Sequence, residues 1–228
     1  MDQIIAIGDI HGRTVWKDIV GNFPSAHIVF LGDYLDPYSY ISDELLLENL
    51  QNIIQFKKEN PQRVTLLMGN HDAHYLYPHM TSCTRYNYHI ATEASILLGD
   101  PEADLRLAYG KNGILFTHAG ITKTWLERFA PEGCLNDLAD QLNDALVNLD
   151  PLLFSVGKRR GGRYNEVGGP IWADVTELDD LPDNLIQVVG HNQVLDIRDE
   201  TFDNGSRIFL ADALAFGKYW DSKTYFPD

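Results

Sequence analysis

The sequence has few cysteines, few basic residues and no long apolar run, and each shortage excludes a class of protein. Its two cysteines, Cys83 and Cys134, have no CxxC spacing, which disfavours a disulfide framework or a thiolate metal site. We expect both to be buried free thiols in a reducing, cytoplasmic compartment. No segment is apolar for long enough to span a membrane, and no basic segment precedes an apolar run at the start. Neither a membrane span nor a signal peptide is therefore predicted.

Positive charge is scarce. The chain has 18 lysines and arginines against 33 aspartates and glutamates, a formal net charge of −15. Such a balance argues against generic binding to nucleic acids or to anionic membranes. An anionic substrate would need local positive charge, from bound metal ions or from a few arginines. The length of 228 residues and the hydrophobic content of 44% predict one α/β domain over residues 1–228 with a full core.

Polar metal-binding side chains follow the first apolar run. Residues 4–7 predict a buried strand, and Gly8-Asp9-Ile10-His11-Gly12 comes directly after it. In an extended segment, residues two positions apart point the same way, so Asp9 and His11 can reach one point. Oxygen and nitrogen donors in that arrangement suit a divalent cation. The alternative is that such strand-end residues only stabilise the turn.

Four further apolar runs end in the same way, at residues 28–31, 65–68, 114–117 and 186–189. In open α/β sheets, ligands bind beyond the carboxyl ends of the strands, where these side chains would gather. The oxygen and nitrogen donors at the five strand ends are Asp9, His11, Asp33, Asn70, His118 and His191. One cation rarely needs so many protein ligands, so the set favours two cations that share a bridging aspartate.

The motifs at these strand ends carry a family resemblance. They are GDIHG from residue 8, GDYLD from 32, GNHD from 69, THAG from 117 and GHNQ from 190. In this order they resemble the calcineurin-like metallophosphoesterases, nearest to the branch of phosphoprotein phosphatases and bacterial diadenosine tetraphosphatases. The resemblance covers most of the chain. It implies an α/β fold, a calcineurin-like β-sandwich of two mixed sheets flanked by helices in four layers (αββα).

The resemblance also implies roles for the site residues. One cation would be held by Asp9, His11 and Asp33, and the other by Asp33, Asn70, His118 and His191. The absence of a thiolate fits manganese, iron or zinc. A hydroxide bridging the two ions would attack phosphorus without a covalent enzyme intermediate. His71 matches the general acid of the family, and Asp36 matches the carboxylate that orients it.

The sequence departs from the phosphoprotein phosphatases at three positions. Pro37 replaces an arginine that grips phosphate in that branch, Met68 replaces another arginine, and Asp72 replaces a glutamate. The metal ligands are thus intact while the phosphate clamp is partly missing. The substrate therefore stays open among phosphoproteins, small phosphate esters, nucleotides and dinucleoside polyphosphates. A non-catalytic scaffold of the same fold is a further alternative, although such relatives usually lose a ligand or the acid.

Other arginines could bind phosphate in place of the missing ones. A glycine-rich loop over residues 155–170 carries the densest basic cluster, and we expect it to fold over bound phosphate through Arg159, Arg160 or Arg163. Arg13, in the first turn of a helix predicted over 13–22, is another candidate, followed by Arg85. For each arginine the alternative is a solvated side chain without a substrate role.

The remaining patterns place other elements. Helices are predicted from Ser42 to about residue 60, near 90–98, near 122–129 and near 136–149, and a hairpin joins strands at 106–109 and 114–117. Residues 74–89 are rich in tyrosine and histidine and predict a lid or pocket wall beside the site, or else a packed pair of surface helices. Their histidines lack a strand-end setting and are not predicted as ligands.

Overall fold

Two mixed β-sheets form the centre of the molecule. The computed structural model describes residues 2–130, 135, 137–164 and 166–227. The strands of the first sheet lie in the order β3 (Val64–Leu66), β2 (His27–Phe30), β1 (Ile4–Ile7) and β9 (Trp220–Asp221). Those of the second lie in the order β4 (Ala108–Lys111), β5 (Ile114–Thr117), β6 (Ile186–Val189), β8 (Arg207–Leu210) and β7 (Arg198–Thr201). The strands β1 to β3 are parallel to one another, as are β5, β6 and β8, whereas β9, β4 and β7 pair antiparallel at the edges.

The alternation of side chains along β1 shows how the layers are built. Ile4 and Ala6 lie in the apolar cluster between the two sheets, together with Phe116 and Phe209 of the second sheet. Ile5 and Ile7 point to the other face, into the cluster that the helices cover. Because both faces of β1 are buried, its sequence is a continuous apolar run instead of an alternating one.

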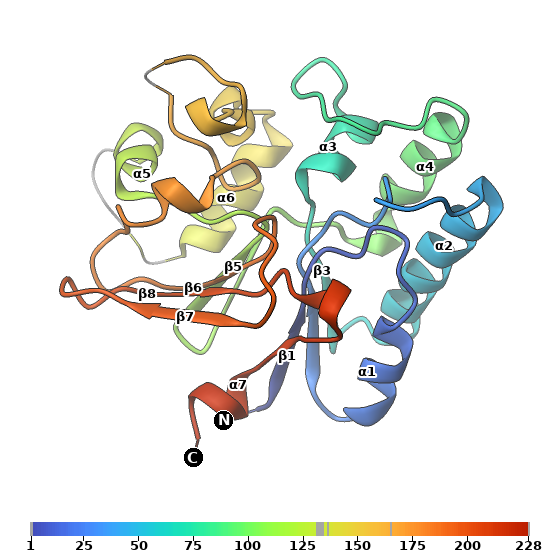
Figure 1. Cartoon of the computed structure of the whole chain (residues 1–228), viewed down its shortest axis with the longest axis horizontal. Helices are drawn as coiled ribbons and strands as arrows, with labels where there is room; N and C mark the ends of the chain where they lie inside the picture. Colours follow the sequence, from blue (N-terminus) through green and yellow to red (C-terminus); the bar gives the residue numbers. More distant parts are fainter. Residues whose placement is uncertain (1, 131–134, 136, 165, 228) are drawn as a thin grey trace.

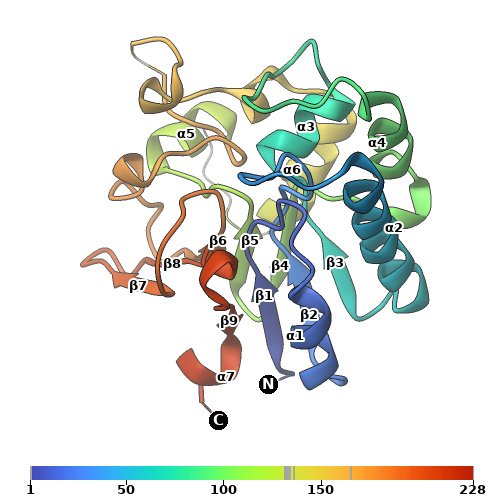
Figure 2. The same ribbon diagram turned by 45° about the vertical axis from the view of Figure 1, so that its right-hand side comes forward.

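Helices cover the outer faces of both sheets (Figure 1, Figure 2). On the first sheet these are α1 (Trp16–Asn22), α2 (Asp43–Glu59) and α4 (Ala91–Leu98); on the second, α5 (Lys123–Phe129) and α6 (Leu138–Val147). The four-layer arrangement is therefore confirmed. The short α3 (Asn70–Leu76) follows β3, and α7 (Ser222–Tyr225) lies near the carboxyl end. Short 3-10 turns occupy Pro101–Ala103, Pro151–Phe154, Lys158–Arg160, Val175–Glu177 and Leu214–Phe216.

Several predicted boundaries need correction. The first helix begins at Trp16 and not at Arg13, because the chain turns at His11 and Gly12, where φ is 42° and 75°. In the hairpin, residues 110 and 111 belong to β4, so Asn112 and Gly113 alone make the turn. The helix α6 is shorter than predicted, and its expected start at residue 136 lies outside the described residues. The edge strands β7 and β9 were not predicted.

Among the described residues, no helix combines the length and the apolar character that a membrane crossing requires.

Candidate metal centre

The loops that follow β1, β2, β3, β5 and β6 meet at one end of the sandwich. Backbone hydrogen bonds join them: the amide of His11 donates to the carbonyl of Asp33 (2.7 Å), and the amide of Gly190 donates to the carbonyl of His118 (2.7 Å). The amide of His191 also donates to the Asp9 carboxylate (2.9 Å). The side chains predicted to gather at the strand ends therefore do lie together.

One group of donors consists of Asp9, His11 and Asp33, whose ligand atoms all lie within 4.8 Å of one another. The Nε2 of His11 lies 3.6 Å from Oδ2 of Asp33 and 3.9 Å from Oδ2 of Asp9. The Nδ1 of the same ring lies 2.7 Å from the carbonyl of Leu35. The carbonyl accepts a hydrogen bond from a protonated Nδ1, and this tautomer leaves the lone pair of Nε2 facing the carboxylates.

A second group consists of Asp33, His118 and His191. The Nδ1 of His118 lies 2.7 Å from the carbonyl of Leu31, and its Nε2 lies 3.6 Å from Oδ2 of Asp33. The side-chain oxygen of Asn70 lies 2.9 Å from His118 Nε2 and 3.0 Å from His191 Nδ1. Asp33 thus belongs to both groups, and its Oδ2 is 3.6 Å from a histidine nitrogen in each.

The electrostatics of both groups suit a cation. Burial lowers the pKa of His11 to about 4 and also lowers the pKa values of His118 and His191, so the rings are neutral and keep a lone pair. Burial opposes the ionisation of Asp33, but attraction to the protonated forms of the surrounding histidines, His118 first, outweighs it and lowers the pKa of this carboxyl. Within the described part of the chain, the buried Nε2 of His191 has no hydrogen-bond partner. Neutral imidazoles around carboxylates fit divalent metal ions.

Asp212 is a further carboxylate at the end of a strand, and it was not predicted as a site residue. It follows β8 and is hydrogen-bonded to Asp9. Burial, with contributions from neighbouring carboxylates, raises the pKa of Asp9 and raises that of Asp212 to about 7. The signal for Asp212 was its place directly after the last apolar strand.

His71 lies beside the donor groups and forms a buried pair with Asp36. Its Nδ1 is 2.6 Å from Oδ2 of Asp36, and the hydroxyl of Tyr75 donates to the other oxygen of that carboxylate (2.6 Å). Burial opposes protonation of His71, but Asp33 and Asp36 outweigh this and raise its pKa. The ring is thereby held with Nδ1 on Asp36 and with Nε2 on the opposite side of the ring.

The Asp72 side chain joins the loop after β2 to the loop after β3. Its carboxylate accepts hydrogen bonds from the backbone amides of Asp33 (2.7 Å), Tyr34 (3.0 Å) and Gly69 (2.8 Å). Both oxygens of this aspartate, which replaces the glutamate of the phosphoprotein phosphatases, therefore hold the backbone of the two loops together. Burial and the nearby Asp33 raise the pKa of Asp72 to about 7.

The backbone of the site is in an unusual conformation. Four site residues other than glycine have φ in the left-handed region: His11 at 42°, Asp33 at 52°, Asp36 at 58° and His191 at 62°. This region is rarely adopted by residues with a Cβ, and such residues cluster at functional sites. A Cβ at Gly69 would lie 2.1 Å from Oδ1 of Asp33, so the loop approaches that carboxylate as closely as glycine permits.

A cavity of about 260 Å³ opens over the donors and is lined by Arg160 and Arg85. Of the four arginines predicted to bind substrate, Arg160 alone lines it, and its guanidinium also bonds to Asp174 (2.8 Å) and Asn192. Arg163 lines a neighbouring groove, and the exposed Arg159 lines neither. Arg13 points to the carbonyls of Asp9 and Ile10 (3.3 Å each) and lines a separate hollow beside α2.

Arg85 is the arginine that the sequence ranked too low. Its Nε donates to the carbonyl of Asp36 (3.1 Å), one terminal nitrogen lies 3.4 Å from Nε2 of His71, and the guanidinium lies 3.9 Å above the ring of Tyr38. Among the residues that the structure describes, no carboxylate oxygen lies within 4.0 Å of its guanidinium nitrogens. The tyrosine-rich segment thus forms a pocket wall, as one of its two interpretations predicted.

Cys83 is not among the ligand atoms of either donor group. Cys83 is free and half-buried, with its sulfur 3.1 Å from both the carbonyl and the side-chain nitrogen of Asn70. Burial raises the pKa of the thiol well above its ordinary value. Cys134 lies outside the described residues.

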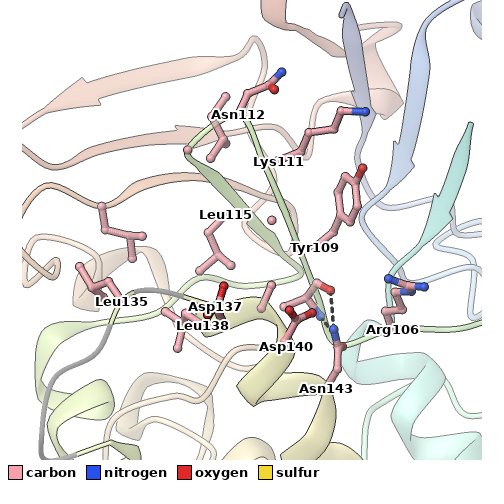
Figure 3. A pocket seen from close by; sticks show the side chains of 16 residues that line it. Arg106, Tyr109, Lys111, Asn112, Leu115, Leu135, Asp137, Leu138, Asp140 and Asn143 are labelled. Atoms are coloured by element: carbon pink, nitrogen blue, oxygen red, sulfur yellow. Dashed lines mark hydrogen bonds between the residues drawn. The ribbon is translucent and has the colours of Figure 1, made fainter.

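A separate cavity of about 490 Å³ lies between the β4–β5 hairpin and α6, where Leu115, Leu135 and Leu138 gather (Figure 3). Its amide side chain, Asn143, bonds to the amides of Leu107 and Ala108 and to the carbonyl of Ala108. Because those bonds cap the free edge of β4, we assign this cavity a structural role.

The chain is similar to several known proteins. A Schizosaccharomyces pombe protein assigned by name to the serine/threonine-protein phosphatases is 36% identical over 76 residues, which are 31% of this chain and 22% of that relative. The chain thus spans about a fifth of its length. The crystal structure of a cold-active protein-tyrosine phosphatase from a Shewanella species matches with a TM-score of 0.56 and 21% identity, over 93% of this chain and 71% of that one. A protein serine/threonine phosphatase from Saccharomyces cerevisiae matches with a TM-score of 0.50 and 15% identity, over 92% and 67%.

The two structural matches share the fold. The profile of the family described as calcineurin-like phosphoesterase matches residues 3–217, nearly the whole chain. The chain therefore belongs to the calcineurin-like phosphoesterase family.

Proposed function

We propose that the chain hydrolyses phosphate esters at a dinuclear metal centre built around Asp33. Asp9 and His11 would complete one ion's ligands, and Asn70, His118 and His191 the other's. The observation that carries this proposal is the position of Asp33 Oδ2, which is 3.6 Å from a histidine nitrogen of each donor group. Bound manganese, iron or zinc ions would supply Lewis acidity toward the phosphoryl oxygens and activate a water molecule.

His71 is the general acid in this proposal. Its ring is fixed by Asp36, and its Nε2 faces the cavity that contains the donors. A proton on Nε2 is therefore placed to pass to the leaving oxygen as the bond to phosphorus breaks. Tyr75 holds the second oxygen of Asp36, so the pair cannot rotate freely.

The test is hydrolysis of p-nitrophenyl phosphate and bis-p-nitrophenyl phosphate by protein loaded with Mn²⁺, Fe²⁺ or Zn²⁺. We expect turnover of at least one of them, and its loss when a chelator removes the metal. Metal-loaded protein that is inert toward both and toward a panel of nucleotides and phosphopeptides would support the non-catalytic scaffold. Protein that binds no transition metal under any loading condition would end the metal proposal.

The two arginines that line the cavity differ in whether a carboxylate binds the guanidinium. Arg85 has no carboxylate partner within the described residues, whereas Arg160 is already bound to Asp174. We expect Arg85→Ala to lower kcat/KM about tenfold or more on the best substrate, a loss of ~1.4 kcal/mol or more. The matched control is Arg159→Ala, which removes an exposed arginine outside the cavity and is expected to keep parental kinetics. Metal content should stay constant in both variants, and an Arg85→Ala enzyme with unchanged kinetics would remove Arg85 from the site.

Several classes of phosphate ester are compatible with the chemistry of this site. The names of the relatives refer to phosphoserine, phosphothreonine and phosphotyrosine proteins, and nucleotides or dinucleoside polyphosphates fit the same chemistry. A cytoplasmic location and a single domain remain predictions.

A further inference from the structure

A groove lined by tyrosines joins the cavity over the donor groups. It has a volume of about 600 Å³ and lies between residues 36–41 and 85–89. Tyr38 and Arg85 line both the groove and the cavity, so the two are continuous. Tyr40 and Tyr88 line the groove but not the cavity, and their side chains are 94% and 82% exposed. Two large aromatic rings are thus left in solvent beside a phosphoesterase site.

The wall of this groove is firmly built. The ring of Tyr86 stacks on that of Tyr75 (4.6 Å between centroids) and lies 4.0 Å from the ring of His74. Tyr88 packs edge-on against Tyr86 at 4.8 Å. The exposed Tyr88 is therefore held by an aromatic stack that reaches back to α3, the helix that carries His71.

A second groove leaves the cavity elsewhere and has a different character. It is lined by Arg160, Arg163 and Trp172, of which Arg160 and Trp172 also line the cavity. The ring of Trp172 lies 6.0 Å from that of His191, whereas the ring of Tyr38 lies 5.0 Å from that of His11. The aromatic groove therefore joins the cavity beside one donor group, and the basic groove joins it beside the other.

The position of His71 indicates on which side of the cavity the leaving group of a substrate would lie. Asp36, which holds His71, lines the tyrosine groove, and Arg85, which lies 3.4 Å from His71 Nε2, lines both spaces. A general acid must face the oxygen that leaves. The leaving group of the substrate therefore lies on the side of the tyrosine groove.

We propose that the tyrosine groove binds the nucleobase of a nucleotide whose nucleoside is the leaving group. This inference rests on the proposed function. In a nucleotide the base lies one ribose beyond the leaving oxygen, and Tyr40 and Tyr88 line the groove but not the cavity. The proposal places the base against these two rings. Stacking on tyrosine faces suits any base. In the reaction, water gives up one proton to solvent and its oxygen bonds to phosphorus. The bond from phosphorus to O5′ breaks, O5′ takes the proton of His71, and His71 regains a proton from solvent.

The test compares adenosine 5′-monophosphate with ribose 5-phosphate, because the same bond breaks in both and only the base differs. We expect metal-loaded parent enzyme to favour the nucleotide at least tenfold in kcat/KM, mainly through KM. Tyr40→Ala and Tyr88→Ala should each lower kcat/KM for the nucleotide at least threefold while leaving that for ribose 5-phosphate unchanged. The matched control is Tyr164→Ala, because Tyr164 is 78% exposed but stacks under Lys158 and lines neither groove.

A binding measurement separates this inference from the proposed function. Saturation-transfer NMR with adenosine and with ribose needs no hydrolysis, and we expect transfer to adenosine that Tyr88→Ala weakens. Equal kcat/KM values for the two phosphates, or no transfer to adenosine, would overturn the inference even if p-nitrophenyl phosphate is hydrolysed. Phosphotyrosine turnover that falls as much as nucleotide turnover in Tyr40→Ala and Tyr88→Ala would also overturn it, in favour of a phosphotyrosyl substrate.

Discussion

Exchange of Asp33 for asparagine is expected to lower metal content from as many as two ions per chain to one or fewer, and to lower turnover at least about 100-fold. The side chain keeps its size but loses the charge that both donor groups share through Oδ2. Even the loss of a partner outside the ligand shell costs about 10–100-fold in affinity or activity at metal sites. Elemental analysis of metal-loaded protein and turnover of p-nitrophenyl phosphate measure the two effects.

The control for this variant is Asp203→Asn, which removes one charge from an exposed position and is expected to match the parent. Thermal unfolding with and without added metal gives a third measurement, because an ion that binds the folded chain raises its unfolding temperature. We expect this rise to shrink in Asp33→Asn. Unchanged metal occupancy in Asp33→Asn would contradict the bridging role.

The second large effect is expected at His71. His71→Ala should lower turnover by about 10²–10⁴-fold for substrates with poor leaving groups, the usual contribution of a general acid. The loss should be much smaller for p-nitrophenyl phosphate, whose leaving group needs little protonation. A series of aryl and alkyl phosphates with leaving groups of increasing pKa measures this as a steeper dependence of rate on leaving-group pKa.

Metal content distinguishes an acid from a ligand in this experiment. It should stay at the parental value in His71→Ala, and Asp36→Asn should show the same pattern more weakly, because the ring remains but loses its ionic partner. His79→Ala, at an exposed histidine of the following segment, is the control. Equal losses for good and poor leaving groups would refute the general-acid role.

The sequence predicted the gathering of the donors from local rules, whereas the sandwich was implied by the family resemblance. Parallel strands buried on both faces are apolar throughout, and their carboxyl ends lie at one edge, so Asp9, Asp33 and His118 could be placed without coordinates. The second helix was equally accessible, since Ser42 caps its start and accepts from the amide of Leu45.

The features that were missed depend on contacts distant in sequence. The strand β7 reads Arg-Asp-Glu-Thr and is an exposed edge, so it has no apolar pattern. Arg85 reaches His71 because its segment folds back over the loop after β2. The hydrophobic periodicity of the sequence carries no signal for such a fold-back. In the basic loop, the chain turns at Gly161 with φ of 98°, which is one reason why a cluster of arginines in sequence is not a cluster in space.

The crowding of carboxylates behind the metal centre has a consequence for the stability of the folded chain. Asp9, Asp33, Asp72 and Asp212 are all at most 5% exposed, and like charges buried together oppose folding. A cation bound among them would remove that repulsion, and its binding free energy adds to the stability of the folded chain. We therefore expect the chain without bound metal to unfold at a lower temperature, and to be cleaved faster by an added protease, than the metal-loaded chain.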